Sequence, residues 1–285
     1  TTKNKMKPAV LNDIKNTTDG SGSVAYATGT DGQVYRSADN GENWQLLSTG
    51  FADHVAAISL YSSTGGAVVG ENGFWARFIN GGLTPATDWQ AYTGTNQLND
   101  LFFTGTSGNG VAVGDAGVVL TTNDGGNSWS APVLTTPHTE DLYAVHYTPA
   151  GGGITMAAGA NGKMYRDVAG TGYACVTDIN PPQLNASQMV NQVTGYAVGN
   201  DGVILKRSSA GMEWEVLPAP PFALTADMNA LSFYDAGNGT VVGNSGFVMA
   251  TADGGASWTN FSTVGNAHIN DVAAISATEQ YLAGD

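Results

Sequence analysis

Cysteine and charge are the scarcest features of this sequence. The one cysteine, Cys175, excludes an internal disulfide, so cysteine usage gives no indication of the cellular compartment. Charged residues make up only 12% of the 285 residues, against roughly a quarter in average proteins. Solubility must therefore rest on Ser, Thr, Asn and Gln. Such a polar, uncharged surface is commoner outside the cytoplasm, and we expect an extracytoplasmic protein, whether secreted, periplasmic, lumenal or on a cell surface.

Long apolar runs, basic residues and metal-ligand clusters are also lacking. No stretch reaches the roughly 18 apolar residues of a membrane span, so we expect no membrane insertion. The net charge of −14 argues against nucleic acid and anionic membrane surfaces as partners. No His/Cys cluster has metal-ligand spacing, so we expect no metal and no cofactor. The histidines are spread over different parts of the chain, at His54, His138, His146 and His268.

Glycine, by contrast, is abundant, and it marks a repeat. The pattern Ser/Thr-x-Asp-x-Gly-x-x-Trp, here called the box, occurs at residues 37–44, 122–129 and 251–258. Its aspartates and tryptophans are Asp39 and Trp44, Asp124 and Trp129, and Asp253 and Trp258. Each box lies in a repeat of roughly forty residues, and repeats of that length built from short strands predict a β-propeller.

A Gly-x-x-Gly turn gives the number of repeats. Its first glycines follow one another at steps of 40 to 45 residues, and they are Gly29, Gly70, Gly114, Gly159, Gly199, Gly243 and Gly284. An apolar segment lies upstream of each turn, a second strand enters the turn, a third leaves it and a fourth begins near the Trp. We therefore expect one all-β domain over residues 1–285, a seven-bladed propeller of four-stranded antiparallel blades.

The third strands predict that the blades are covered on both faces. The residues two and three positions past the second glycine are both apolar, as in Val119-Leu120 and Val248-Met249. Consecutive strand residues point to opposite sides, so neither side meets water. The seventh repeat has only its first two strands. We expect residues 1–10 to close the ring as an outer strand of this blade; the alternative is a native chain that continues beyond Asp285.

The boxes themselves are expected to be structural rather than ligand-binding. The Asp can accept hydrogen bonds from backbone N–H groups in the tight turn, and Gly supplies a positive φ. The Trp fills space between sheets, and we expect its N–H to lie near a partner.

The inner strands and turns define one candidate surface. Polar residues near the start of the inner strands are expected to ring the mouth of the central channel: Asn12, His54, Asn99, Tyr143, Asn185, Asn229 and Asn270. The turns on the same face are rich in Asp and Asn, which favours a cation site or a basic partner. The alternative is that Asp and Asn simply prefer such turns, and that the channel groups bind water.

The longest connections between blades define a second surface. Residues 130–141, 175–183 and 215–227 contain most of the prolines and would form one raised arc. Binding residues concentrate on loops carried by rigid scaffolds, so His138, Ile179, Phe222 and Leu224 are candidate partner contacts. The alternative is that these loops are padding between repeats.

Basic residues form a third candidate. Arg36, Arg77, Arg166 and Lys206 each lie four residues past their second glycine, and Arg207 follows directly. One shared register would place them at one height around the ring, where they could bind carboxylates of a partner chain. The alternative is inter-blade salt bridges and capping of strand ends.

The repeat resembles that of a known family. Residues 98–103 read LNDLFF and residues 110–129 read GVAVGDAGVVLTTNDGGNSW, which is similar to the photosystem II stability/assembly factor-like propellers, a branch of the Asp-box (BNR-type) repeat families. The resemblance covers nearly the whole chain. In assembly-factor members a basic surface receives a membrane-protein partner, which implies that role for Arg36, Arg77, Arg166 and Arg207.

Three functions compete at this point. The first is a non-enzymatic, extracytoplasmic protein-binding or assembly scaffold, or one domain of a larger surface structure. The second is a photosystem II-type assembly factor. The third is a sialidase-like Asp-box glycoside hydrolase with a carbohydrate ligand, which needs three arginines converging on one carboxylate. The arginines of this chain fall in separate blades and no paired-carboxylate motif is present, so we expect a protein partner and no enzyme.

Overall fold

The computed structural model describes residues 10–18, 23–50, 52–84, 88–92, 94–104, 108–132, 139–148, 154–168, 174–175, 182–191, 193–208, 214–262 and 267–285. Within these ranges the regular structure consists of β-strands and short 3-10 turns. None of the helical segments described has the length and apolar character needed to cross a membrane.

The described strands form seven separate antiparallel sheets, each made of strands consecutive in the chain. Sheet 1 contains β1 (Leu11–Thr18), β2 (Ser23–Gly29), β3 (Val34–Ser37) and β4 (Gln45–Leu47). Sheet 2 contains β5 (Val55–Ser62), β6 (Gly65–Gly70), β7 (Trp75–Phe78) and β8 (Trp89–Tyr92). Sheet 3 contains β9 (Leu98–Phe103), β10 (Gly110–Gly114) and β11 (Val119–Thr122).

The second half of the chain continues the series. Sheet 4 contains β12 (Leu142–Thr148), β13 (Ile154–Gly159), β14 (Met164–Val168) and β15 (Ala174–Cys175). Sheet 5 contains β16 (Leu184–Met189), β17 (Gly195–Gly199), β18 (Ile204–Arg207) and β19 (Glu215–Leu217). Sheet 6 contains β20 (Met228–Phe233), β21 (Gly239–Gly243), β22 (Val248–Thr251) and β23 (Thr259–Asn260), and sheet 7 contains β24 (Ile269–Ala274) and β25 (Gln280–Gly284). The 3-10 turns are η1 (Glu71–Gly73), η2 (Asn80–Gly82), η4 (Asp115–Gly117), η5 (Ala160–Gly162), η6 (Asn200–Gly202) and η7 (Asn244–Gly246).

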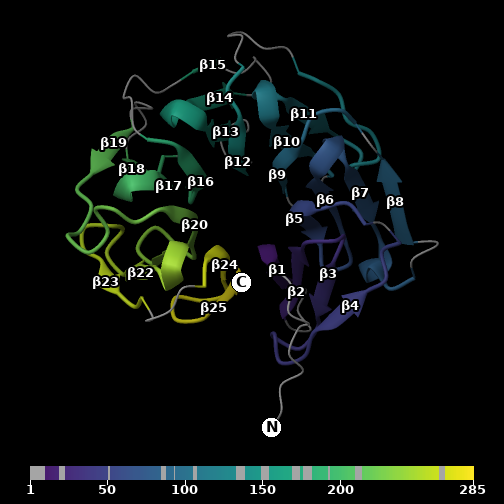
Figure 1. The fold of residues 1–285 in the computed structure, drawn as a ribbon, viewed down its shortest axis with the longest axis horizontal. Coiled ribbons are helices and arrows are strands. Elements are labelled where there is room, and N and C mark those ends of the chain that lie inside the picture. Colours follow the sequence, from purple (N-terminus) through teal and green to yellow (C-terminus); the bar gives the residue numbers. More distant parts are fainter. Residues whose placement is uncertain are drawn as a thin grey trace.

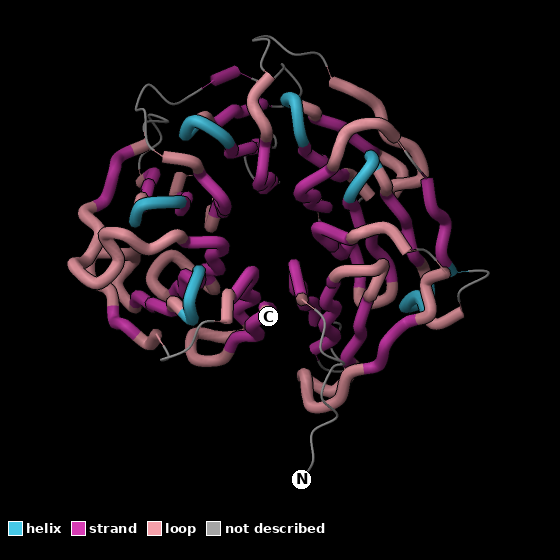
Figure 2. Tube along the Cα trace, in the orientation of Figure 1, coloured by secondary structure: helices cyan, strands magenta, loops and turns pink. Residues whose placement is uncertain are grey.

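The sheets follow one another around a common centre, with the first strand of each sheet innermost (Figures 1 and 2). Each inner strand contacts the inner strand of the next sheet along the chain. The inner strand β1 also contacts β24 and β25, so the last sheet lies beside the first. The arrangement brings residues from all parts of the chain to one central axis.

The glycine turns are required by a close approach of two strands. The first glycine of each turn pairs with the first residue of the inner strand, as Gly114 does with Leu98. A Cβ at Gly114 would lie 2.0 Å from the backbone oxygen of Gln97, which no side chain can tolerate. Two residues later the backbone takes a left-handed conformation, with φ 54° at Ala116, before the third strand begins. These local demands explain the regular Gly-x-x-Gly spacing.

The walls between neighbouring sheets are dry, as the apolar third-strand pairs predict. Between sheets 5 and 6, Tyr196 stacks on Phe233 with ring centroids 3.8 Å apart. Val248 and Met249, consecutive residues of β22, are both buried although they point to opposite faces. Each sheet is therefore held mainly by apolar packing against its neighbours.

Two sheets have fewer strands than the expected four. In sheet 3 the fourth strand is reduced to a single bridge between Thr121 and Ser130. Sheet 7 comprises two strands among the described residues, and Leu282 of β25 is 44% exposed. Residues 1–9 lie outside the described residues, so closure of the ring by residues 1–10 stays a prediction.

Candidate functional site

A cavity of about 300 Å³ lies at the centre, lined by the inner strands of all seven sheets. Six of the seven residues assigned to the channel mouth line it: Asn12, Asn99, Tyr143, Asn185, Asn229 and Asn270. His54 is not among the lining residues, and assigning it to this set was wrong. Val55 pairs with Gly70, which places Ala56 in the lining position, while His54 precedes the strand and its Nε2 lies 3.2 Å from Asn12 Nδ2.

A β-bulge at the start of each inner strand sets the direction of these side chains. In sheet 1, Leu11 pairs with Gly29 and Asp13 with Thr28, so Asn12 is left without a pairing partner. The same irregularity recurs in the other six sheets. A bulge re-aims its side chain out of the regular pleat. Here it turns the asparagines toward the neighbouring sheet.

Each asparagine of the set bonds the neighbouring sheet, and we call this bond the amide staple. The Nδ2 groups donate to the backbone oxygen of the first residue in the next inner strand: Asn12 to Val55 (2.7 Å), Asn99 to Leu142 (2.9 Å), Asn185 to Met228 (2.9 Å), Asn229 to Ile269 (3.0 Å) and Asn270 to Leu11 (2.8 Å). Asn99, Asn185 and Asn229 also donate to a side-chain oxygen of the turn in their own sheet. These amides are thus engaged in holding sheets together.

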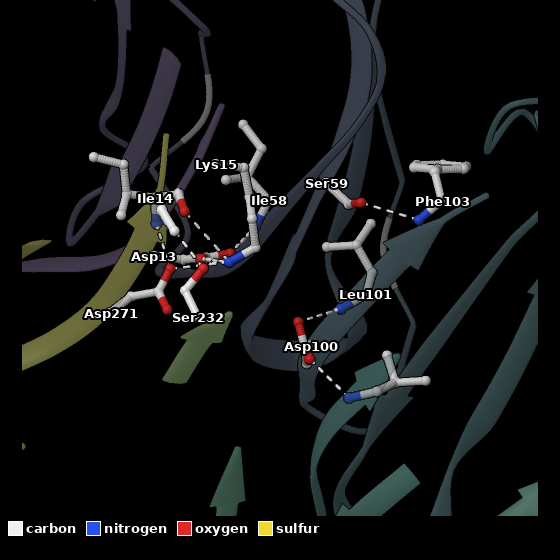
Figure 3. A network of polar contacts seen from close by, with 12 residues as sticks. Asp13, Ile14, Lys15, Ile58, Ser59, Asp100, Leu101, Phe103, Ser232 and Asp271 are labelled. Carbon is white, nitrogen blue, oxygen red and sulfur yellow. Dashed lines mark hydrogen bonds and ion pairs between the residues drawn. The ribbon is translucent and has the colours of Figure 1, made fainter. Parts of the chain in front are cut away.

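A second set of side-chain acceptors cross-links the same neighbouring sheets, and Figure 3 labels several of them. Each acceptor takes a backbone N–H of the next sheet: Asp13 from Ile58 (2.7 Å), Ser59 from Phe103 (3.0 Å), Asp100 from Val145 (2.8 Å), Gln188 from Phe233 (2.7 Å), Ser232 from Ala274 (3.0 Å) and Asp271 from Ile14 (2.9 Å). At the remaining junction, between sheets 4 and 5, His146 hydrogen-bonds to the backbone of Met189. Every junction therefore has a polar cross-link inside the ring.

One junction carries a charged network. Lys15 Nζ lies 2.9 Å from Asp271 and also pairs with Asp13 on its own strand. The Lys15 side chain keeps 36% of its surface exposed to the cavity, whereas Asp13 and Asp271 keep 7% and 13%. Figure 3 shows the three side chains converging where β1 meets β24, with Asp100 on β9 apart from them.

The environment separates the pKa values of these groups. Burial opposes ionisation of Asp13, but the charge of Lys15 and several hydrogen bonds hold the pKa of Asp13 below its ordinary value. Burial raises the pKa of Asp271 well above the usual range, against the opposing charge of Lys15. Burial also raises the pKa of Asp100 to about 7 and lowers that of His146 to about 4. At neutral pH, His146 is therefore neutral, and the lowered pKa of Asp13 keeps its negative charge beside Lys15.

The polar atoms of the central groups are largely used in cross-links between sheets. Among the residues that the structure describes, no group of three or more His, Cys, Asp and Glu could hold a metal ion. The geometry therefore makes the centre a cross-linked hub.

The boxes are closed networks of hydrogen bonds. In the three boxes the hydroxyl of the first residue donates to the aspartate at 2.8, 2.8 and 2.9 Å. The aspartates, Asp39, Asp124 and Asp253, accept the backbone N–H four residues on. Hydrogen bonds from Ser128 and Ser257, first among the causes, lower the pKa of Asp124 and of Asp253 to about 2.

The tryptophans of the boxes pack between sheets, but one expectation about them was wrong. Trp44 meets Tyr281 of sheet 7 edge-on at 6.0 Å, and Trp129 meets Trp75 of sheet 2 at 6.2 Å. The buried Nε1 atoms of Trp129 and Trp258 have no hydrogen-bond partner in the described part of the chain. The indoles act through their apolar surface, which outweighs one unsatisfied N–H.

The basic residues share a register but are not a free surface. Arg36, Arg77, Arg166 and Lys206 all stand opposite the middle of their second strands. Arg77 reaches Asn127 (3.5 Å) in the box of sheet 3, and Lys206 reaches the backbone oxygen of Gly254 (2.7 Å) in the box of sheet 6. Arg36 donates to the Tyr26 hydroxyl within its own sheet (3.1 Å).

The alternative of inter-blade salt bridges is not observed for three of the arginines. Among the described residues, Arg36, Arg77 and Arg166 have no carboxylate within ion-pair distance. Arg207 is 3% exposed, which leaves it no surface for a partner and corrects its assignment as a contact residue. Burial, followed by the charge of Arg166, lowers the pKa of Arg207. Arg77 and Lys206 are best described as caps on the boxes of neighbouring sheets.

The loop candidates have different outcomes. His138 and Ile179 lie outside the described residues. Phe222 and Leu224 lie between β19 and β20, 39% and 58% exposed, and Ala223 between them is fully buried. The loop therefore presents two apolar side chains while one residue anchors it.

Comparison with known proteins identifies the fold. No protein-family model matches the chain, and no curated protein does. Among solved structures, "YCF48 bound to D1 peptide" has a TM-score of 0.75 at 16% identity, covering 97% of this chain and 89% of that one. YCF48 from Cyanidioschyzon merolae has a TM-score of 0.75 at 16% identity, covering 97% and 93%. The WD40 β-propeller domain of Doa1 has a TM-score of 0.76 at 14% identity, covering 98% and 91%. At these identities the likeness shows the fold alone, and the chain is a β-propeller.

Proposed function

We propose that this chain is a non-enzymatic scaffold that binds another protein, built on a seven-bladed propeller. Each of the seven sheets is one blade, and β24 and β25 begin the seventh. The amide staple from Asn270 to Leu11 and the contacts of β1 with β24 support a closed ring. In this proposal residues 1–10 add the outer strand of the seventh blade.

The observation that carries the binding function is the loop of residues 218–226, here called the apolar loop. Phe222 and Leu224 are exposed on it, although burying such side chains is favourable by about 1.5–3 kcal/mol each. Exposed apolar groups on a fixed support are typical of protein contacts, where large side chains in a partner's pocket carry most of the binding energy.

The apolar loop is fixed rather than loose. The Ala223 N–H donates to Pro220 (2.8 Å), and the Ala226 N–H donates to Ala223 (3.1 Å). The N–H of Gly202, in turn η6, donates to Ala226 (2.9 Å). A Cβ at Gly202 would lie 2.3 Å from the backbone oxygen of Ala223, so the loop lies directly on the turn. A preorganised loop loses little entropy on binding.

The absence of enzymatic activity is part of the proposal. A sialidase-like site needs arginines that converge on one carboxylate. Arg36, Arg77 and Arg166 are on β3, β7 and β14, the third strands of three different sheets. The central polar groups are occupied with cross-links between sheets. Both observations favour a scaffold over a glycoside hydrolase.

The location of the protein is also proposed rather than derived from the fold. With charged residues at 12% and a net charge of −14, the surface relies on uncharged polar groups. We place the protein outside the cytoplasm, as a secreted, periplasmic, lumenal or surface protein.

A photosystem II-type assembly factor is the second candidate. The observation in its favour is the likeness to YCF48 over 97% of this chain, including a structure of YCF48 bound to a D1 peptide. The burial of Arg207 and the capping role of Arg77 count against transferring a basic binding surface to this chain. Binding of a D1 peptide, measured by fluorescence anisotropy, would favour this candidate.

The scaffold proposal is tested by removing the apolar side chains of the loop. The double variant Phe222→Ala/Leu224→Ala is compared with wild type and with Leu46→Ala, a matched change at an apolar residue 49% exposed on β4. Proteins of the source organism's extracytoplasmic fraction are captured on each immobilised chain and quantified by mass spectrometry. We expect a defined set retained by wild type and Leu46→Ala and lost by the double variant. Equal retention by all three chains, with unchanged melting temperatures, would contradict the proposal.

A further inference from the structure

We propose that the junction between sheets 7 and 1 is an acid-sensitive latch, in which Asp13, Lys15 and Asp271 hold the ring closed and acidification releases it. The latch joins the two ends of the described chain, because Lys15 and Asp271 are 256 residues apart in sequence. It is independent of the apolar loop and of the protein-binding function proposed above.

This junction differs from the others in the chemistry of its cross-link. The neighbouring junctions use Ser59, Gln188 and Ser232, which are uncharged, or a single carboxylate, as with Asp100. In the described part of the ring, a lysine lies within ion-pair distance of a carboxyl group of another sheet where Lys15 meets Asp271, and Asp13 supplies a second carboxyl group to the same Lys15. An ion pair responds to pH, whereas a hydroxyl or amide cross-link does not.

The fully buried part of the apolar packing at this junction is small. The buried core shared by sheets 7 and 1 consists of Ile14, Ala27, Tyr35, Ala273 and Ala283, of which three are alanines, and Leu11, Trp44 and Tyr281 pack against it partly buried. The core shared by sheets 5 and 6 contains larger side chains such as Tyr196, Phe233 and Met249. Because small side chains bury less apolar area, the polar latch contributes a larger share of the stability here.

The groups that face the latch come from four of the inner strands. They are Asp13 and Lys15 on β1, Asp271 on β24, Asp100 on β9, and Tyr143 and His146 on β12. The inner strands β5, β16 and β20 contribute only uncharged residues to the cavity, such as Ala56, Gln188 and Ser232. The charge balance of the cavity therefore depends on these six residues.

The charge balance of the cavity changes below about pH 4. Because the folded pKa of Asp13 is lowered from 3.8, its stabilising charge is present above that value and is lost as the pH falls through the folded pKa. His146, with a pKa of about 4, then carries a positive charge in the cavity that Lys15 also lines. Asp271 and Asp100, whose pKa values are raised, are already protonated and supply no anion. Lys15 at the junction then has no ionised carboxylate beside it, and His146 on β12 of sheet 4 adds a second positive charge to the same cavity.

Either Asp13 or Asp271 can pair with Lys15, so the variants must remove the two carboxylates separately and together. The pKa of Asp271 is raised and that of Asp13 is lowered, so Asp13 is the more readily ionised partner of Lys15. Asp271→Asn keeps an oxygen for the Ile14 N–H and leaves Asp13 to pair with Lys15. We expect it to behave like wild type at pH 7. Asp13→Asn/Asp271→Asn removes both possible anions from Lys15 and should reproduce the acid state at pH 7. The triple variant Asp13→Asn/Lys15→Met/Asp271→Asn removes the charge altogether and should abolish the acid response.

The test is amide hydrogen exchange at several pH values between 7 and 3, measured by mass spectrometry. The exchange rates are corrected for the intrinsic pH dependence of amide exchange. Peptides from β1 and β24 report on the latch, and peptides from β16 and β20 report on a junction cross-linked by Gln188. At pH 3 we expect protection in β1 and β24 to fall about tenfold more than in β16 and β20, as in a local opening. Ser59→Ala, which removes an uncharged cross-link, serves as the control and should show the same acid response as wild type.

The outcomes separate a latch from general acid unfolding. The proposal is supported if the double variant shows the selective loss at pH 7 and the triple variant stays protected at pH 3. If the double variant does not fold, the wild-type titration and the triple variant still decide. Loss of protection in all four strands at the same pH would overturn the proposal, and so would a triple variant as acid-sensitive as wild type.

Discussion

The amide staple of Asn229 gives the sharpest stability prediction. Its Nδ2 donates to the backbone oxygen of Ile269 at 3.0 Å and to the side-chain oxygen of Asn244 at 2.9 Å. Asn229→Ala removes both bonds and leaves the two oxygens without this donor. At about 1 kcal/mol net per hydrogen bond, the free energy of unfolding should fall by about 2 kcal/mol. That is roughly a thirtyfold change in the unfolding equilibrium.

The assay is urea unfolding at pH 7, monitored by both tryptophan fluorescence and circular dichroism. Coincidence of the two unfolding curves checks two-state behaviour. Thr225→Ala, at an exposed position of the apolar loop, is the control and should stay within about 0.5 kcal/mol of wild type. Asn229→Asp adds a second test. A carboxylate cannot donate, and it would face two acceptors, so this variant should be less stable than Asn229→Ala at pH 7 and recover part of the loss at pH 4.

The staple reasoning would be refuted by an Asn229→Ala variant that unfolds within about 0.5 kcal/mol of wild type. It would also be refuted if Asn229→Asp were the more stable of the two variants at pH 7. Asn185 makes the same pair of bonds, to Met228 and Asn200, so Asn185→Ala should cost a similar amount.

Three further predictions concern the turns and the cavity. Gly243→Ala should lower the melting temperature clearly, because its Cβ would lie 2.1 Å from the backbone oxygen of Asp227; an unchanged melting curve would contradict the close approach. Ala116→Gly should raise the free energy of unfolding in urea by about 0.5–1 kcal/mol, because Ala116 is held at φ 54°; a loss of stability would contradict the strain. For Asp100, burial raises the folded pKa to about 7, so wild type should lose stability as the pH rises from about 4 to 7. Asp100→Asn should lack that slope in urea unfolding at pH 5 and pH 8, and parallel profiles would contradict the assignment.

The repeat could be predicted from the sequence because its demands are local. Position 114 must be glycine because a Cβ there would collide with the backbone oxygen of Gln97. The same close contact recurs at the first glycine of each turn, at a fixed spacing along the chain. Likewise, two apolar residues in a row on a strand predict burial on both faces, as found for Val248 and Met249. Such patterns are visible in a single repeat and are strengthened by repetition.

The role of the inner polar residues could not be predicted, because their partners are distant in sequence. Asn12 bonds a backbone oxygen 43 residues away, and Lys15 pairs with a carboxylate 256 residues away. A backbone acceptor leaves no trace in the sequence. In sheet 2 the bulge position is occupied by the apolar Ala56, so the nearest polar residue, His54, was assigned to it. The signal that could have pointed to the cross-links is the Asn-Asp pair at the start of three inner strands, at residues 12–13, 99–100 and 270–271.

The use of polar groups at the centre limits where a partner can bind. A ligand that entered the cavity to bind Asn185 or Asn229 would have to replace bonds that hold neighbouring sheets, and Gln188 and Ser232 are committed in the same way. Exchanging a hydrogen bond to the protein for one to a ligand changes the free energy only slightly, so such binding would be weak or would loosen the ring. The faces between sheets are closed by apolar packing. The rim remains, and on it the apolar loop exposes side chains whose burial by a partner would be favourable without disturbing any cross-link.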